Sequence, residues 1–199
     1  MKIAFVGDSF CADTGPKTWP ELVRHQLDAK LISKGVQGAN QYSILKQTEN
    51  ILKLKPDLII FTHTDPYRLA NRHDRPLGAR PCEIHKDTDA IWKAGNDYYE
   101  HLMDYGFHEL THRALVNECW SIGCATKTIH LFSFSTKELQ FRDYDWDIYL
   151  PNSYQEKSLA RISYDYQTPD NDDGWSTLPN HMNYAGNKVV SEIVLEMLK

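Results

Sequence analysis

Ile3-Ala4-Phe5-Val6-Gly7-Asp8-Ser9, near the start of the 199-residue chain, is the stretch that decides the fold. Its first four residues form an unbroken apolar run, which is typical of a strand buried on both faces of a parallel sheet. The glycine, aspartate and serine that follow end this strand in a turn. Leu58-Ile59-Ile60-Phe61 is a second run of the same kind, and Lys55-Pro56-Asp57 separates it from the helical pattern before it. Both runs predict buried strands.

Helical patterns alternate with these strands along the chain. Apolar spacing and capping residues predict helices over residues 18–27, 41–54, 90–124 (interrupted near Gly106) and 183–198. Further strands are expected at residues 29–33 and 128–134, and long irregular loops at residues 66–90 and 136–177. Strands joined through helices pair in parallel with right-handed crossovers. We therefore predict an α/β fold, a three-layer α/β/α sandwich with a sheet of about five strands, in a single domain over residues 1–199.

Composition narrows the function classes. The chain is 41% hydrophobic and 25% charged, and its 22 Lys+Arg and 27 Asp+Glu residues give a net charge of -5. The basic residues form no stripe along the sequence. Because nucleic-acid-binding proteins usually carry a basic surplus or a basic stripe, we expect no nucleic-acid partner. No apolar run approaches the ~20 residues that cross a bilayer, so we expect no membrane partner. The amino-terminal apolar stretch is too short for a signal peptide, which predicts a cytoplasmic protein or a virion component. The four cysteines (Cys11, Cys82, Cys119, Cys124) lack CxxC spacing and are expected to be free thiols.

Polar residues follow the predicted strands at the edge where parallel sheets bind ligands. Ser9 follows the first strand, Gly38 the second and Thr64 the third, while His181 precedes the last helix. A serine on such a turn becomes a nucleophile when a histidine takes its proton, and N–H groups with a side-chain donor can hold the oxyanion. We predict Ser9 and His181 as the catalytic pair, with Ser9, Gly38 and Thr64 as the oxyanion hole. Each residue alone is explained as well by a strand-ending turn or a helix start.

These segments together resemble the SGNH/GDSL hydrolase superfamily. Residues 7–10 match its first block, residues 35–40 resemble the second, residues 56–61 the strand leading into the third, and residues 181–187 the last. The resemblance implies a flavodoxin-like sheet and a serine esterase that needs no cofactor. It also implies a small acyl ester as substrate, and we expect an O-acetyl group on a carbohydrate. Residues 18–22 look most like a subgroup found in phages and their hosts, which would place the protein in a virion or a host cytoplasm.

Two positions depart from the family pattern. Thr64 stands where the third block has asparagine, and its hydroxyl has a shorter reach. Leu178 stands where the family has an aspartate three residues before its histidine, so either Asp172 or Asp173 from the preceding loop or a backbone carbonyl would orient His181. These departures motivate an alternative from another class, a non-catalytic binding or structural protein of the same fold, for example one associated with a phage.

Further residues near these segments are candidates for supporting roles. Those that could support the catalytic pair are Asp8, Asn40, His63, Asp65, Asp172, Asp173 and Asn180. Those that could contact substrate are Phe10, Tyr67, Arg68 and Trp175. For His63 an interior polar neighbour is an equal alternative. Tyr67 and Arg68 belong to a loop that also contains Arg72, Arg75 and Arg80, and for this loop the alternative is a solvated surface. For Trp175 and the other aromatic residues of 144–175 the alternative is packing on the core.

A competing motif lies in the long helical stretch. His108-Glu109-Leu110-Thr111-His112 matches H-E-x-x-H, in which two histidines on one helix face bind zinc and the glutamate acts as base. Leu115 and Glu118 stand where the extended pattern has glycine and histidine. The helical period predicts Met103, Phe107, Leu110 and Ala114 as the buried stripe, with the histidines on a solvated face. A zinc site at His108 and His112 is therefore a minor alternative, and we expect no metal.

Overall fold

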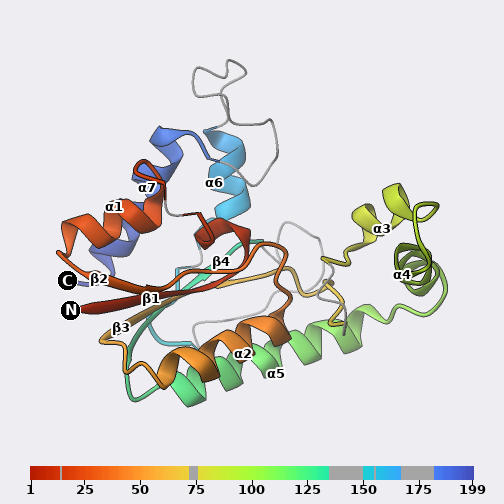
Figure 1. Cartoon of the computed structure of the whole chain (residues 1–199), viewed down its shortest axis with the longest axis horizontal. Helices are drawn as coiled ribbons and strands as arrows, with labels where there is room; N and C mark the ends of the chain where they lie inside the picture. The colour runs from red at the N-terminus through yellow and green to blue at the C-terminus, as the bar shows by residue number, and fades with distance from the viewer. Residues whose placement is uncertain (14, 72–75, 135–149, 155, 167–181) are drawn as a thin grey trace.

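The computed structural model describes residues 1–13, 15–71, 76–134, 150–154, 156–166 and 182–199. These residues form a parallel sheet in the order β2-β1-β3-β4 (Figure 1). The strands are β1 (Lys2–Gly7), β2 (Lys30–Ser33), β3 (Leu58–His63) and β4 (Lys127–Phe132). Beyond β4, the segment 152–154 pairs with His130 through an isolated parallel bridge at Ser153, at the position expected for a fifth strand. The predicted α/β fold is confirmed.

Helices cover both faces of the sheet (Figure 1). Those on one face are α1 (Trp19–Gln26), α6 (Leu159–Asp165) and α7 (Tyr184–Glu196), and those on the other are α2 (Gln41–Leu52) and α5 (Tyr105–Gly123). The two central apolar runs fill both interfaces because successive strand residues point to opposite faces. Phe5 thus packs edge-to-face against Trp19 of α1, at 5.3 Å between ring centroids, whereas Phe61 clusters with Ile44 of α2.

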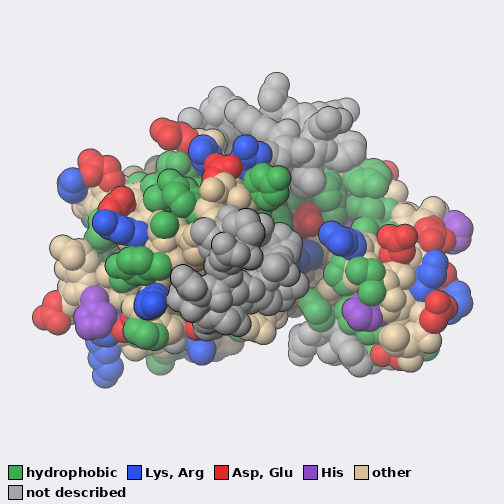
Figure 2. All heavy atoms as spheres, turned by 90° about the horizontal axis from the view of Figure 1, so that it is seen from above, with side chains coloured by type: hydrophobic (Ala, Val, Ile, Leu, Met, Phe, Trp, Pro, Cys, Tyr) green, Lys and Arg blue, Asp and Glu red, His purple; other side chains and the backbone are tan. Residues whose placement is uncertain are grey.

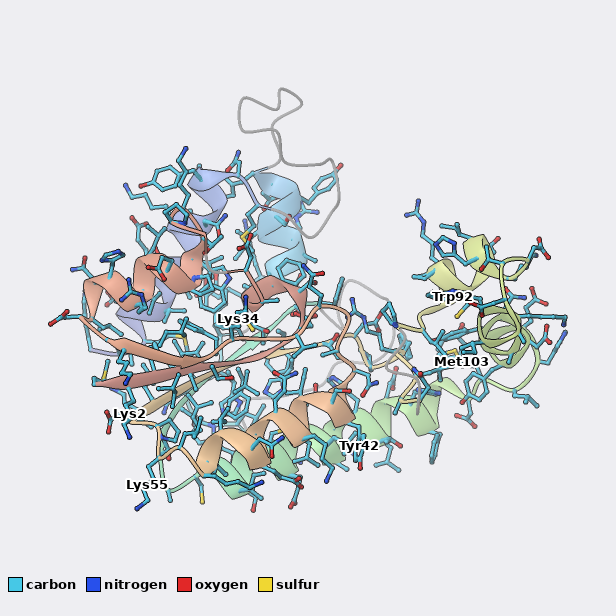
Figure 3. The ribbon with its side chains drawn as sticks, in the orientation of Figure 1. Lys2, Lys34, Tyr42, Lys55, Trp92 and Met103 are labelled. Carbon is cyan, nitrogen blue, oxygen red and sulfur yellow. The ribbon has the colours of Figure 1, made fainter. Side chains whose placement is uncertain are left out.

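Two further helices lie at one end of the molecule. They are α3 (Ala79–His85) and α4 (Ala90–His101), which pack on each other away from the sheet (Figure 1). Trp92, labelled in Figure 3, forms a small core of its own with Leu77 and Cys82, far from Lys2 at the start of β1. On the face that Figure 2 shows, the described acidic and basic side chains are interspersed. No helix in the described ranges is long and apolar enough to span a membrane.

Several helix predictions need correction. The loops predicted at residues 66–90 and 136–177 contain the short helices α3 and α6, the second capped by Ser158, whose hydroxyl accepts the Arg161 N–H at 3.1 Å. The helical stretch expected over residues 90–124 stops at His101 rather than near Gly106. It starts again at Tyr105 because the Asp104 carboxylate accepts the Phe107 N–H and caps α5.

The buried face of α5 is opposite to the one predicted. Phe107 and Leu110 are 61% and 55% exposed, whereas Glu109 and His112 are only 6% and 5% exposed. The prediction from apolar periodicity was wrong because the first half of α5 packs against a polar loop, residues 64–67, and not only against the apolar sheet.

Candidate active site

The Ser9 turn begins where β1 ends. Ser9 opens a short 3₁₀ helix, η1 (Ser9–Cys11), and the Asp8 carboxylate caps it by accepting the Phe10 N–H at 3.1 Å. Gly7 is needed at the end of β1, because a Cβ there would collide with the Thr62 side chain on β3. The Ser9 hydroxyl oxygen is buried and has no hydrogen-bond partner in the described part of the chain. The turn therefore holds a serine hydroxyl that no bond to a described residue engages.

The loop after β2 is bonded to this turn. The Gly35 N–H donates to the Cys11 carbonyl at 3.1 Å, and the Val36 N–H donates to the Gly7 carbonyl at 2.9 Å. Gly38 has a φ of 72°, a left-handed conformation that favours glycine. Among the described residues, neither the Gly38 N–H nor the Ser9 N–H donates a hydrogen bond. Both remain available to an acceptor such as an oxyanion.

The loop after β3 meets the other two through Arg68. Its Nη1 donates to the Ala39 carbonyl at 3.2 Å and lies 3.9 Å from Asp8 Oδ2, so the neighbours of Gly38 and Ser9 share one guanidinium. Thr64 is 1% exposed, and its hydroxyl oxygen is buried without a hydrogen-bond partner among the described residues. The structure thus brings the three strand-end loops together at one edge of the sheet.

Asp8 is the electrostatic centre of this edge. Complete burial raises its pKa above the usual 3.8, while the Arg68 charge and hydrogen bonds from Ser133 and the Phe10 N–H oppose that rise. The Ser133 hydroxyl donates to Asp8 Oδ1 at 2.8 Å. Sequence reasoning missed Ser133, although its position just after β4 puts it at the same sheet edge as the other three loops.

Two predicted supporting residues shape the loops. Asn40 caps α2 by accepting the Ser43 N–H at 2.9 Å, and its amide donates to the Leu69 carbonyl at 3.2 Å. Asp65 accepts the Tyr67 N–H at 2.9 Å, and burial raises the pKa of its carboxyl.

His63 is an interior polar residue, the alternative left open from sequence. Its Nδ1 lies 3.0 Å from Gln41 Nε2, and its Nε2 lies 2.9 Å from His130 Nδ1. The His63 and His130 rings are stacked, at 5.2 Å between centroids, and His130 also stacks on Phe61 at 4.8 Å. Burial lowers the pKa of His63 well below 6.5 and that of His130 to about 3. This side chain is therefore bonded within the α2 side of the sheet.

The predicted substrate contacts have different surroundings. Phe10 is 6% exposed and packs edge-to-face on Phe134, so its ring belongs to the core. The Tyr67 hydroxyl donates to Glu109 of α5 at 2.8 Å. The Arg68 guanidinium lies over the Phe134 ring, 5.5 Å from its centroid, within the convergence of loops described above.

The remaining predicted site residues lie outside the described residues. They are Asp172, Asp173, Trp175, Asn180 and His181, and the departing position Leu178 lies outside the described residues as well. The described chain resumes at Met182, and Asn183 caps α7 by accepting the Gly186 N–H at 3.0 Å. Asn187 accepts the Trp19 N–H at 2.8 Å, which joins the start of α7 to the start of α1.

The H-E-x-x-H segment is bonded to protein groups. His108 Nε2 lies 2.7 Å from the Tyr98 hydroxyl, Glu109 accepts the Tyr67 hydroxyl, and His112 Nε2 donates to the Thr64 carbonyl at 2.9 Å. The described ranges contain no group of three or more His, Cys, Asp or Glu side chains that could hold a metal ion. This geometry gives no support to the zinc alternative.

Comparison with known proteins gives matches in structure but not in sequence. No protein-family model and no curated protein matches the chain. TesA is similar over 100% of this chain and 98% of its own, with 13% identity and a TM-score of 0.58. The psychrotrophic esterase EstA from Pseudoalteromonas sp. is similar over 99% and 96%, with 11% identity and a TM-score of 0.54.

A third similar structure is described as a member of the G-D-S-L family, the family that the sequence motifs resemble. A member of the lipolytic protein G-D-S-L family from Veillonella parvula DSM 2008 is similar over 98% of this chain and 97% of its own, with 12% identity and a TM-score of 0.54. At these identities the likeness shows the fold. The chain therefore has the fold that the SGNH/GDSL resemblance implied, and the phage-type subgroup stays a prediction.

Proposed function

We propose that this chain is a serine ester hydrolase of the SGNH/GDSL type with Ser9 as its nucleophile. The observation that carries the proposal is the buried Ser9 hydroxyl, which no described residue bonds, at the edge where three strand-end loops converge. Buried polar atoms normally have partners, so an unengaged hydroxyl at a sheet edge suited to ligands favours a chemical role. The fold shared with EstA and TesA supports the same reading.

In the proposed reaction, Ser9 Oγ attacks the ester carbonyl carbon while His181 takes the hydroxyl proton. The carbonyl oxygen becomes an oxyanion, held by the N–H groups of Ser9 and Gly38 and by the Thr64 hydroxyl. The intermediate collapses, the alcohol leaves with the proton from His181, and the acyl group stays on Ser9. Water, deprotonated by the same histidine, then attacks the acyl carbon. This second intermediate collapses, the bond from the acyl carbon to Ser9 Oγ breaks, and His181 returns the proton to Oγ as the acid leaves.

The case for His181 as the base comes from its described neighbours in sequence. Met182 packs against the core cluster that contains Phe10, the residue after the proposed nucleophile. Trp19 links the Ser9 turn to the start of α7. Its indole N–H donates to the Phe10 carbonyl at 2.7 Å, and its backbone N–H donates to the Asn187 side chain. Asp172, Asp173 or a backbone carbonyl would orient the imidazole. These contacts support a base supplied by the chain just before α7.

The proposed substrate class is a small acyl ester, in particular an O-acetyl group on a carbohydrate. The similar esterase EstA was solved as a form inhibited by monoethylphosphonate, which makes a phosphonate the natural probe here. A fluorophosphonate should label the wild-type protein, and p-nitrophenyl acetate should be hydrolysed.

The test compares Ser9→Ala with Ser121→Ala, which changes an exposed serine on α5. We expect Ser9→Ala to lose both labelling and turnover and Ser121→Ala to keep both. An unlabelled wild-type protein that leaves p-nitrophenyl acetate intact would refute the hydrolase. The non-catalytic alternative predicts that result, together with carbohydrate binding that Ser9→Ala does not change.

A further inference from the structure

The buried face of α5 needs polar partners. Glu109 and His112 are almost fully buried, and burying a carboxylate or an imidazole without hydrogen bonds is costly. Both residues find partners in one place, the loop of residues 64–67 that leaves the carboxyl end of β3. His108 also reaches this loop, with its Nδ1 3.4 Å from the Pro66 carbonyl. The H-E-x-x-H segment therefore clamps the loop to α5.

Among these hydrogen bonds, the one from His112 bears most directly on the proposed active site, because its acceptor is the carbonyl of Thr64, a proposed oxyanion-hole residue. A carbonyl oxygen only accepts hydrogen bonds, so His112 Nε2 carries the proton and donates it to Thr64 O at 2.9 Å. Burial lowers the pKa of His112 to about 4, so the imidazole stays neutral in neutral solution. This bond fixes the orientation of the peptide unit that follows the proposed oxyanion-hole residue.

Fixing that peptide also constrains the Thr64 side chain. Threonine is β-branched and stiff at χ1, so its hydroxyl position depends closely on its backbone. A threonine hydroxyl is a shorter donor than an asparagine amide, which leaves less tolerance for misplacement. We propose that His112 is a positioning residue for ester hydrolysis, holding the Thr64 backbone so that its hydroxyl reaches the oxyanion. This inference rests on the proposed esterase function.

The test uses two substitutions at His112. His112→Leu removes the donor, whereas His112→Gln keeps an amide N–H near the position of Nε2. For p-nitrophenyl acetate we expect His112→Leu to lower kcat by ~10-fold to 100-fold with little change in KM, as a misplaced catalytic group does. His112→Gln should restore most of kcat. Val116→Ala is the matched control, since Val116 lies one turn further along α5 and clusters with Leu150; it should lower stability and leave kcat unchanged.

A double-mutant cycle separates positioning from general damage. If His112 acts through the Thr64 hydroxyl, His112→Leu should lower kcat no further in a Thr64→Val background. If the two losses multiply, or if His112→Leu alone keeps the wild-type kcat, the positioning role is refuted while the esterase function stands.

A second measurement needs no activity. Hydrogen exchange of the Tyr67 and Arg68 amides, which are bonded within the loop, should become faster in His112→Leu but not in Val116→Ala. Unchanged exchange in His112→Leu would overturn the clamp. A wild-type protein without turnover would instead refute the proposed function and the catalytic role of His112, and exchange would still decide whether α5 holds the loop.

Discussion

Mild acid should destabilise this protein, because His112 and His130 are buried as neutral imidazoles. Burial lowers the pKa of His112 to about 4 and that of His130 to about 3, against ~6.5 in an unfolded chain. A histidine with a lowered folded pKa contributes its full stabilisation above pH ~6.5 and loses it as the pH falls towards the folded value. His63 acts in the same direction, since burial and then the two other histidines lower its pKa.

The size of the effect follows from proton linkage. At pH 5 the unfolded chain has bound almost one proton at each of the two positions, and the folded protein almost none. The cost is about 2 kcal/mol for each histidine and about 4 kcal/mol for the pair. A typical domain is stable by ~5–15 kcal/mol, so this loss is large. Asp8 and Asp65 offset part of it, because burial raises their pKa values and the folded state takes up protons there as the pH falls.

Urea unfolding at pH 7, 6 and 5, followed by the fluorescence of the five tryptophans, measures the loss. In His112→Gln the free energy of unfolding should fall by about 2 kcal/mol less between pH 7 and pH 5 than in the wild type. The control is His101→Gln, because the His101 side chain is 70% exposed, and it should show the wild-type pH dependence. The reasoning would be refuted by an equal pH dependence in His112→Gln and the wild type.

Three further substitutions test the site. Thr64→Asn should raise kcat for p-nitrophenyl acetate by ~10-fold or more, since an amide donor reaches further into the oxyanion hole; a lower kcat would contradict that role. Ser133→Ala removes the hydroxyl that donates to Asp8 and should lower the free energy of unfolding by ~1–3 kcal/mol, measured in urea; no change would show that the bond is dispensable. Gly38→Ala places a Cβ 2.6 Å from the Pro76 Cβ, on a residue whose backbone has a left-handed φ. This change should lower the free energy of unfolding by at least ~1 kcal/mol in the same urea assay. An unchanged free energy of unfolding would contradict the left-handed conformation at Gly38.

The sheet could be predicted from sequence because its strands are buried on both faces. Residues 3–6 and 58–61 read as unbroken apolar runs, and the structure pairs Ile3 with Leu58 and Val6 with Phe61 in parallel register. Residues after such strands meet at one edge by topology alone, which is why the three strand-end loops could be grouped in advance. Ser133 was missed because a serine after a strand has no distinctive pattern, and only the strand order shows that it faces Asp8.

The burial of α5 shows where apolar periodicity fails as a guide. A helix is expected to bury its apolar stripe, but the partner of the first half of α5 is a loop with a backbone carbonyl at Thr64 and a hydroxyl at Tyr67. A partner of this kind favours donors and acceptors, so Glu109 and His112 are buried while Phe107 faces outward.

The same bonds explain why a zinc-protease motif need not bind zinc. A metal bound through the Nε2 atoms of both histidines would require His112 to give up its bond to the Thr64 carbonyl and His108 to give up the Tyr98 hydroxyl. Either exchange would leave a polar group of the loop or of α4 without its partner, at a cost of ~1–3 kcal/mol when that group is buried. The spacing of two histidines on a helix brings them to one face, but the groups opposite that face decide their chemistry. Here the groups opposite belong to the loop after β3, so the histidines act as hydrogen-bond partners that fix the loop.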